Sequence, residues 1–222
     1  MRRVAMITIG QSPRTDVMTD VEPILGPNIE TLHCGALDDL SLEEIAALEP
    51  SLGEELLVTR LRDGTEVKLG HSKVVDKMNQ CIENLEPEVD SIAILCTGEF
   101  PELQSKKIML KPSELMGHIL ESILQSGKLG VLIPNAAQKE VVIKKWKRDN
   151  LEVFVQALSP YQEQDMNEIE RIAERFRNEG VDLIALDCIG YSDELSAFMK
   201  REVGVPTLLS RTILARVIRE LL

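Results

Sequence analysis

Short, unbroken runs of apolar residues recur along this chain and constrain its fold more than any other feature. Each run is rich in Val and Ile, and longer stretches with helical spacing of apolar residues separate the runs. Strands that are buried on both faces show such continuous hydrophobicity, whereas strands with one face in water alternate. The pattern therefore predicts parallel sheets covered by helices. The runs are Val4–Ile9, Ser91–Cys96, Leu129–Ile133, Leu151–Gln156, Leu183–Cys188 and Pro206–Leu209.

The stretches between these runs carry helix signals of their own. Ser41-Leu-Glu-Glu44 is a capping box that predicts a helix start, and Ser12 with Pro13 resembles an N-cap followed by the first helical residue. Apolar stripes predict further helices, including a last one that docks on the rest of the protein instead of fraying. These helices cover residues 73–85, 113–125, 136–147, 165–178, 193–202 and 211–222.

One segment departs from the alternation of strands and helices. Leu57–Arg62 and Thr65–Leu69 have the pattern of two strands, and Asp63-Gly64 between them is typical of a type I′ turn. We expect this hairpin to decorate an otherwise parallel sheet in the first half of the chain.

The two halves of the chain resemble each other. In each half a strand opens the unit, and a later strand begins after an Asp and ends in Cys, one residue and then Gly, as in Asp90–Gly98 and Asp182–Gly190. The predicted fold is therefore α/β with two similar lobes, each a mainly parallel sheet flanked by helices. We place the first lobe at residues 1–112 and the second at 113–210, with the helix over 211–222 packing back on the first lobe.

The net charge and the short apolar runs argue against several classes of partner. With 25 Lys and Arg against 37 Asp and Glu, the net charge is −12, which disfavours nucleic acids and anionic membranes. The apolar runs are far shorter than the roughly 18 residues that a membrane span needs, and Met1-Arg2-Arg3 leads into a strand and not into a secretory signal. We expect a cytoplasmic protein that binds no membrane; the sequence leaves a homodimer open.

Cysteine and histidine spacing gives no sign of a metal site. The four cysteines, at positions 34, 81, 96 and 188, form no Cys-x-x-Cys pair, and the three histidines are scattered. We expect four free thiols and no bound metal. The glycine-rich signatures of dinucleotide and nucleoside triphosphate sites are also absent, which argues against those cofactors.

Ligands of open α/β sheets bind beyond the carboxyl ends of the strands, where backbone N–H groups and helix N-termini are exposed. The loop after the first predicted strand, Thr8-Ile-Gly10-Gln11-Ser12-Pro-Arg14, offers such a site. Its glycine allows close approach, and Gln11, Ser12 and Arg14 supply donors, so the loop suits an anion. The alternative is a capped turn with a surface arginine.

The other two candidate loops, Cys96-Thr97-Gly98 and Cys188-Ile189-Gly190, each end a buried strand. A partly exposed cysteine that faces backbone N–H groups has its thiol pKa lowered from about 8.5, which favours reactivity. The alternative is that both cysteines are inert small hydrophobes. Cys81 lies on the apolar face of a predicted helix and belongs to the core, while Cys34 could be structural or reactive.

Three motifs resemble the AroM protein family over nearly the whole chain. They are Ile7-Thr-Ile-Gly10, Asp187-Cys188-Ile189-Gly190 and the closing segment Pro206–Arg216. This resemblance itself implies no particular reaction.

More distantly, the two-lobed layout with one cysteine per lobe resembles the aspartate/glutamate/hydantoin racemase superfamily, whose enzymes use no cofactor. The resemblance implies that Cys96 and Cys188 are acid/base residues in a cleft between the lobes. Thr97, Gly98, Ile189 and Gly190 would then supply backbone groups that bind a small carboxylic or amino acid.

Racemases of this type typically follow the first cysteine with Asn-Thr and the second with Thr-His, whereas this chain has Thr-Gly and Ile-Gly. Three interpretations stay open beside a racemase or isomerase: a single-cysteine isomerase or decarboxylase, a carboxylate sensor without catalysis, and a purely structural role.

Overall fold

The computed structural model describes residues 1–222 and contains two four-stranded parallel sheets. The strand order is β2-β1-β5-β6 in the first sheet and β10-β9-β7-β8 in the second. Each sheet therefore has the same topology, in which the first strand of the half lies between its second and third strands. This arrangement confirms the predicted pair of similar lobes. The strands are β1 Arg2–Thr8, β2 Ile29–Gly35, β5 Ser91–Ile94, β6 Ile108–Leu110, β7 Gly127–Ile133, β8 Leu151–Ala157, β9 Leu183–Leu186 and β10 Thr207–Leu209.

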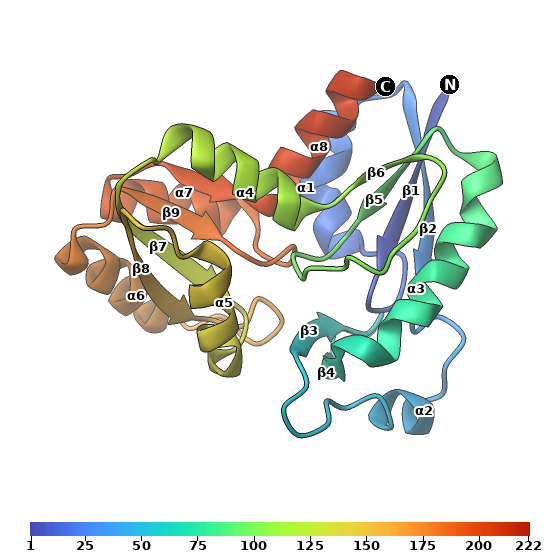
Figure 1. Cartoon of the computed structure of the whole chain (residues 1–222), viewed down its shortest axis with the longest axis horizontal. Coiled ribbons are helices and arrows are strands. Elements are labelled where there is room, and N and C mark those ends of the chain that lie inside the picture. Colours follow the sequence, from blue (N-terminus) through green and yellow to red (C-terminus); the bar gives the residue numbers. More distant parts are fainter.

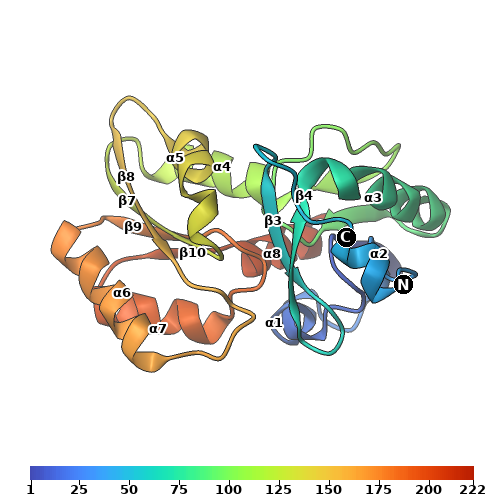
Figure 2. The same cartoon turned by 90° about the horizontal axis from the view of Figure 1, so that it is seen from below.

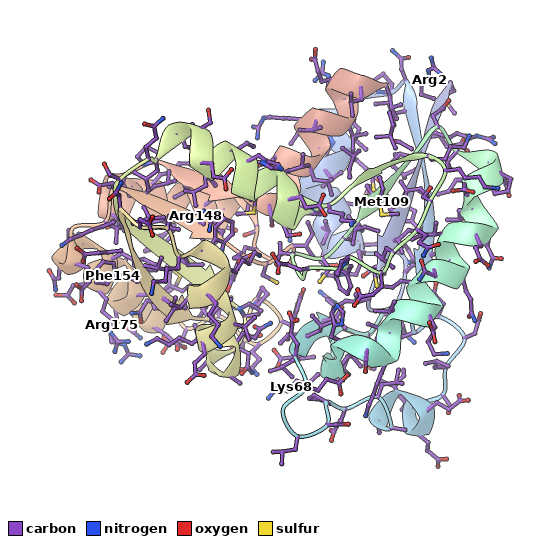
Figure 3. The ribbon with its side chains drawn as sticks, viewed as in Figure 1. Arg2, Lys68, Met109, Arg148, Phe154 and Arg175 are labelled. Atoms are coloured by element: carbon purple, nitrogen blue, oxygen red, sulfur yellow. A yellow bond between two sulfur atoms is a disulfide. The ribbon has the colours of Figure 1, made fainter.

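Helices cover both sheets and bury an apolar core on each face (Figure 1). In the same view with side chains drawn, Arg2 and Met109 mark the first lobe, and Phe154 and Arg175 mark the second (Figure 3). The capping box at Ser41 is confirmed, since the side chain of Ser41 accepts from the backbone of Glu44 and the reverse contact is also present. The helices are α1 Thr15–Leu25, α2 Leu42–Ala46, α3 His71–Leu85, α4 Pro112–Ile123, α5 Lys139–Trp146, α6 Met166–Glu179, α7 Asp193–Val203 and α8 Ser210–Leu221, with 3₁₀ turns at Glu86–Glu88 and Ala136–Gln138. No helix has the length and apolar character that crossing a membrane requires.

The last helix returns to the first lobe. α8 follows directly on β10 of the second sheet, yet Leu214 and Ile218 share a buried core with Val17 and Val21 of α1. Figure 1 shows α8 beside α1, with α4 running between the two lobes. The C-terminal segment therefore connects the carboxyl end of β10 in the second sheet to the core of the first lobe.

The hairpin forms where the sequence predicts it, with β3 at Leu56–Arg60 and β4 at Glu66–Gly70. The predicted type I′ turn at Asp63-Gly64 is wrong. The N–H of Gly64 donates to the carbonyl of Leu61 at 3.0 Å, and of the two residues only Gly64 has a positive φ, at 96°. The turn therefore begins at Leu61, one residue earlier than predicted, and closes a longer loop with a left-handed glycine. Seen from below, the hairpin lies between the two lobes (Figure 2).

The predicted helix start at Ser12 and Pro13 is also wrong, because α1 begins only at Thr15. Asp38, from the loop after β2, takes both donors of Ser12: the hydroxyl donates to Oδ2 at 2.6 Å and the backbone N–H to Oδ1 at 2.7 Å. Arg14 therefore takes the N-cap position, and no side chain caps the start of α1. The bond between Ser12 and Pro13 is a cis peptide.

Two of the four cysteines form a disulfide, so the expectation of four free thiols is wrong. Cys34 lies on β2 and Cys81 on α3, which packs across the same face of the first sheet, and their Cα atoms are 5.6 Å apart. Only Cys96 and Cys188 are free.

Removing this disulfide should lower the free energy of unfolding by about 4 kcal/mol, because the bridge closes a loop with a sequence separation of 47 residues. Urea unfolding of the oxidised protein with and without a reductant measures the loss. The Cys34→Ser, Cys81→Ser double variant is the control, and its unfolding midpoint should not respond to the reductant. Equal midpoints for the oxidised and the reduced wild type would contradict the bridge.

Candidate functional site

Both free cysteines line one cavity of about 520 Å³ that takes its walls from both lobes. Cys96 follows β5 of the first sheet, and Cys188 follows β9 of the second. The first lobe also contributes Arg14 and the hairpin, while the second contributes α5 and Tyr161. The carboxyl ends of corresponding strands therefore meet at one site, as their matching sequence positions predict.

The two thiols have similar surroundings. The N–H of Gly98 donates to Cys96 Sγ at 3.4 Å, and the N–H of Gly190 donates to Cys188 Sγ at 3.4 Å. The predicted backbone donors are thus present, but the predicted lowering of the pKa is wrong. Burial raises the pKa of Cys96 to about 12 and also raises the pKa of Cys188, because loss of water penalises a thiolate more than these hydrogen bonds stabilise it.

Arg14 is buried at the cavity wall, so it is not a surface arginine. Its Nε and Nη2 donate to the two carboxylate oxygens of Asp16 at 2.9 and 2.7 Å, and Nη2 also donates to the hydroxyl of Tyr161 at 3.2 Å. Nη1 is buried without a hydrogen-bond partner. A buried cationic donor that lacks a partner is costly unless a ligand satisfies it, so Nη1 is suited to an anion.

The structure places the other predicted binding residues in two groups. Thr97, Gly98 and Ile189 line the cavity, whereas Thr8, Gly10, Gln11, Ser12 and Gly190 do not. The Thr8 hydroxyl accepts from the N–H of Gly10, and Gln11 bonds to the backbone of Leu37 and Arg62. Gly190 leaves room for Tyr161, since a Cβ there would lie 2.6 Å from the Tyr161 hydroxyl oxygen.

A buried ion pair beside the cysteines was not predicted. Lys145 Nζ lies 2.9 and 3.0 Å from the two carboxylate oxygens of Asp187, and it also donates to the carbonyl of Thr97 at 2.9 Å. The indole of Trp146 donates to Asp187 at 2.7 Å, and the Thr97 hydroxyl donates to the Asp187 carbonyl at 3.1 Å. Lys145 thus connects the loops of both cysteines. Neither Lys145 nor Trp146 belongs to a motif, so nothing local in the sequence marks them.

Two residues at the start of α8 hold the Cys188 loop in place. The Ser210 hydroxyl donates to the carbonyl of Cys188 at 2.9 Å, and Arg211 Nε donates to the carbonyl of Ile189 at 2.9 Å. Arg211 also pairs with Asp20 of α1 at 2.8 Å. Both residues belong to the closing motif. The position of Arg211 between apolar strand and helix residues was a sequence feature from which its buried role could have been predicted. No group of three or more His, Cys, Asp or Glu side chains is placed to hold a metal ion.

The two parallel-sheet lobes have a racemase-like α/β fold. The structure is similar to allantoin racemase from Klebsiella pneumoniae, with a TM-score of 0.68 and 14% identity, covering 100% of this chain and 87% of that chain. It is similar to the maleate isomerase Iso from Pseudomonas putida S16, with a TM-score of 0.63, 12% identity and coverage of 99% and 92%. The aspartate racemase of Picrophilus torridus gives a TM-score of 0.62, 16% identity and coverage of 99% and 94%.

The sequence itself identifies the family. The model of the family described as AroM protein matches residues 4–222, so this chain belongs to the AroM family. This match confirms the resemblance drawn from the three motifs. Among the curated proteins, no sequence matches this chain.

Proposed function

We propose that this protein is a cofactor-independent racemase or isomerase that moves a proton at the carbon next to a carboxylate. The observation that carries the proposal is the meeting of Cys96, Cys188 and the unpartnered Arg14 Nη1 at one cavity. The fold is shared with two racemases and an isomerase, which supports a reaction of this kind. The carboxylate would bind Arg14, and the carbon beside it would lie between the two sulfur atoms.

Cys188 is the better candidate for the base, because more donors face its sulfur. Arg14 donates to the Tyr161 oxygen, which leaves the Tyr161 hydrogen free to point toward Cys188 Sγ, 3.7 Å from that oxygen. Together with the N–H of Gly190, two donors can stabilise a Cys188 thiolate, whereas Cys96 has one. Cys96, with its pKa near 12, is the natural acid.

The proton balance follows from these roles. The Cys188 thiolate removes the α-proton, and the electron pair of the broken C–H bond spreads into the carboxylate held by Arg14. The Cys96 thiol then donates its proton to the opposite face of the carbon, which inverts its configuration. The cycle leaves Cys188 as a thiol and Cys96 as a thiolate, so the reverse reaction starts from this state. Preorganised donors at the carboxylate would stabilise the charge that develops.

The raised thiol pKa values favour one alternative function. A cavity with two neutral thiols and one free guanidinium nitrogen can bind a small carboxylate without turning it over, as a sensor would. A single competent cysteine would allow a third function, namely isomerisation or decarboxylation followed by protonation on one face.

Solvent deuterium uptake separates these functions. A panel of amino, hydroxy and dicarboxylic acids is first screened by thermal shift, because a ligand at a hundredfold excess over its Kd stabilises the fold by about 2.7 kcal/mol. The binders are then incubated with the protein in D₂O and followed by NMR. Deuterium at the α-carbon with inversion is the expected result, and binding without any exchange supports the sensor.

Alkylation of Cys96 by iodoacetamide should be slow at neutral pH and rise about tenfold per pH unit up to pH 10. The thiolate is the nucleophile, and its fraction keeps rising until the pH reaches the raised pKa of about 12. Mass spectrometry of the Cys96 peptide gives the rate. The urea-unfolded protein is the control, where the rate should level off about one unit above the ordinary pKa of about 8.5. A plateau below pH 9 in the folded protein would contradict the raised pKa.

A further inference from the structure

Buried polar atoms without partners gather at the cavity. Six buried side-chain nitrogen or oxygen atoms lack a hydrogen-bond partner, and three of them, Arg14 Nη1, Thr59 Oγ1 and Gln138 Oε1, belong to cavity-lining residues. Buried polar groups in folded proteins almost always have partners. Thr59 Oγ1 packs against Gly10, away from the cavity lining, so Arg14 Nη1 and Gln138 Oε1 are the two atoms that indicate what a ligand must supply.

Gln138 indicates a donor on the ligand. Its Nε2 donates to the carbonyl of Leu56 on the hairpin at 3.0 Å, which fixes the orientation of the amide. The atom left without a partner is therefore the oxygen Oε1, which only accepts hydrogen bonds. A carboxylate cannot satisfy it, whereas an N–H group can.

The charges of the cavity leave room for one carboxylate only. Its two cationic side chains are Arg14 and Lys145. All three protons of Lys145 have acceptors, namely the Thr97 carbonyl and the two oxygens of Asp187. Arg14 has one nitrogen to spare. The acidic side chains of Glu54, Glu55 and Glu99 also line the cavity, and they would repel a second anionic group.

We propose that the ligand is a monocarboxylate that carries an amide or amine N–H as its second polar group. The carboxylate binds Arg14 Nη1 and the N–H binds Gln138 Oε1. Dicarboxylates are rejected, because their second carboxylate faces an acceptor and an acidic wall. This inference rests on the proposed function only in that Arg14 holds the carboxylate.

Three probes with the same carbon chain test this preference by titration calorimetry: succinamate, succinate and monomethyl succinate. Their far ends are an amide, a carboxylate and a methyl ester, so only succinamate offers an N–H. We expect succinamate to bind at least about tenfold more tightly than the other two, since a site built for a donor rejects analogues that lack it. Gln138→Met, which keeps the size but removes the acceptor, should abolish the preference and leave the affinity for the ester within about threefold.

Gln138→Glu is the second variant, because it restores an acceptor at the same length and should retain discrimination against succinate. Equal or tighter binding of succinate or the ester to the wild type would overturn the inference, as would a preference that survives in Gln138→Met or binding of none of the three probes. Deuterium exchange on the tightest binder is judged separately. Amide-selective binding without exchange leaves the inference standing and removes the enzyme proposal. Exchange on acids that lack an N–H would support the enzyme proposal and contradict the inference of an N–H on the ligand.

Discussion

Cys188→Ala should lower the rate of α-deuterium incorporation by about 10²- to 10⁴-fold, the usual contribution of a positioned acid or base. The reason is the surroundings of this sulfur, which has the N–H of Gly190 at 3.4 Å and the Tyr161 hydroxyl at 3.7 Å. Cys96, the other free cysteine at the cavity, has one such donor, the N–H of Gly98. The measurement is NMR of a panel acid in D₂O, at a concentration that saturates both proteins.

Cys96→Ser separates a two-base mechanism from a single-cysteine mechanism. With Cys188 intact, the enantiomer whose proton faces Cys188 should still exchange that proton with solvent, while inversion stops. Chiral chromatography of the same samples reports inversion independently of exchange. If Cys96→Ser inverts its substrate as fast as the wild type, the proposed acid role of Cys96 fails and a single-cysteine reaction remains.

The Cys34→Ser, Cys81→Ser double variant is the matched control, because it removes the other two cysteine sulfurs, which lie in the core of the first lobe and not at the cavity. Its exchange rate should equal that of the wild type at a temperature where both are folded. Should Cys188→Ala exchange deuterium as fast as this control, the cavity would not use cysteine chemistry.

Local sequence patterns predicted the sheets well, because continuous burial leaves a continuous apolar run. Val4–Ile9 contains most of β1, and Leu183–Cys188 contains β9. Neither β2 nor β6 was among the predicted runs, since Ile29–Gly35 has polar residues between its apolar ones and Ile108–Leu110 is too short to form a run. Contacts between distant segments account for the errors at Ser12 and at the disulfide. Asp38 binds Ser12 across 26 positions of sequence, and α3 carries Cys81 to Cys34 across 47.

In the candidate site, too, local features were predicted from the sequence and features that depend on distant segments were not. The cysteine loops were predicted because each follows a buried strand directly, and the backbone donors to both sulfurs are local features of those loops. The raised thiol pKa values were not predicted, because they arise from the closure of the two lobes and the hairpin around the sulfurs. Tyr161 and Lys145 reach the cavity from the second lobe without any motif, so only the folded structure identifies them.

Asp187→Ala should destabilise the protein by about 3–5 kcal/mol, because it leaves the buried Lys145 ammonium without its counter-ion. The side chains of Asp187 and Lys145 are only 2% and 11% exposed, so water replaces the lost carboxylate only in part. Trp146 Nε1 loses its acceptor in the same variant. Urea unfolding measures the loss.

The comparison that tests this explanation is the double variant Asp187→Leu, Lys145→Met, which removes both charges and keeps the volume. It should recover much of the stability lost in Asp187→Ala, since replacing a buried pair by apolar groups is often neutral. Glu202→Ala is the control, because its pair with Arg201 is 39% and 66% exposed and is worth at most about 1 kcal/mol. If Asp187→Ala lost no more than this control, the Lys145 ammonium would be accessible to water. It could then bind a second carboxylate, and the argument for a monocarboxylate ligand would fail with it.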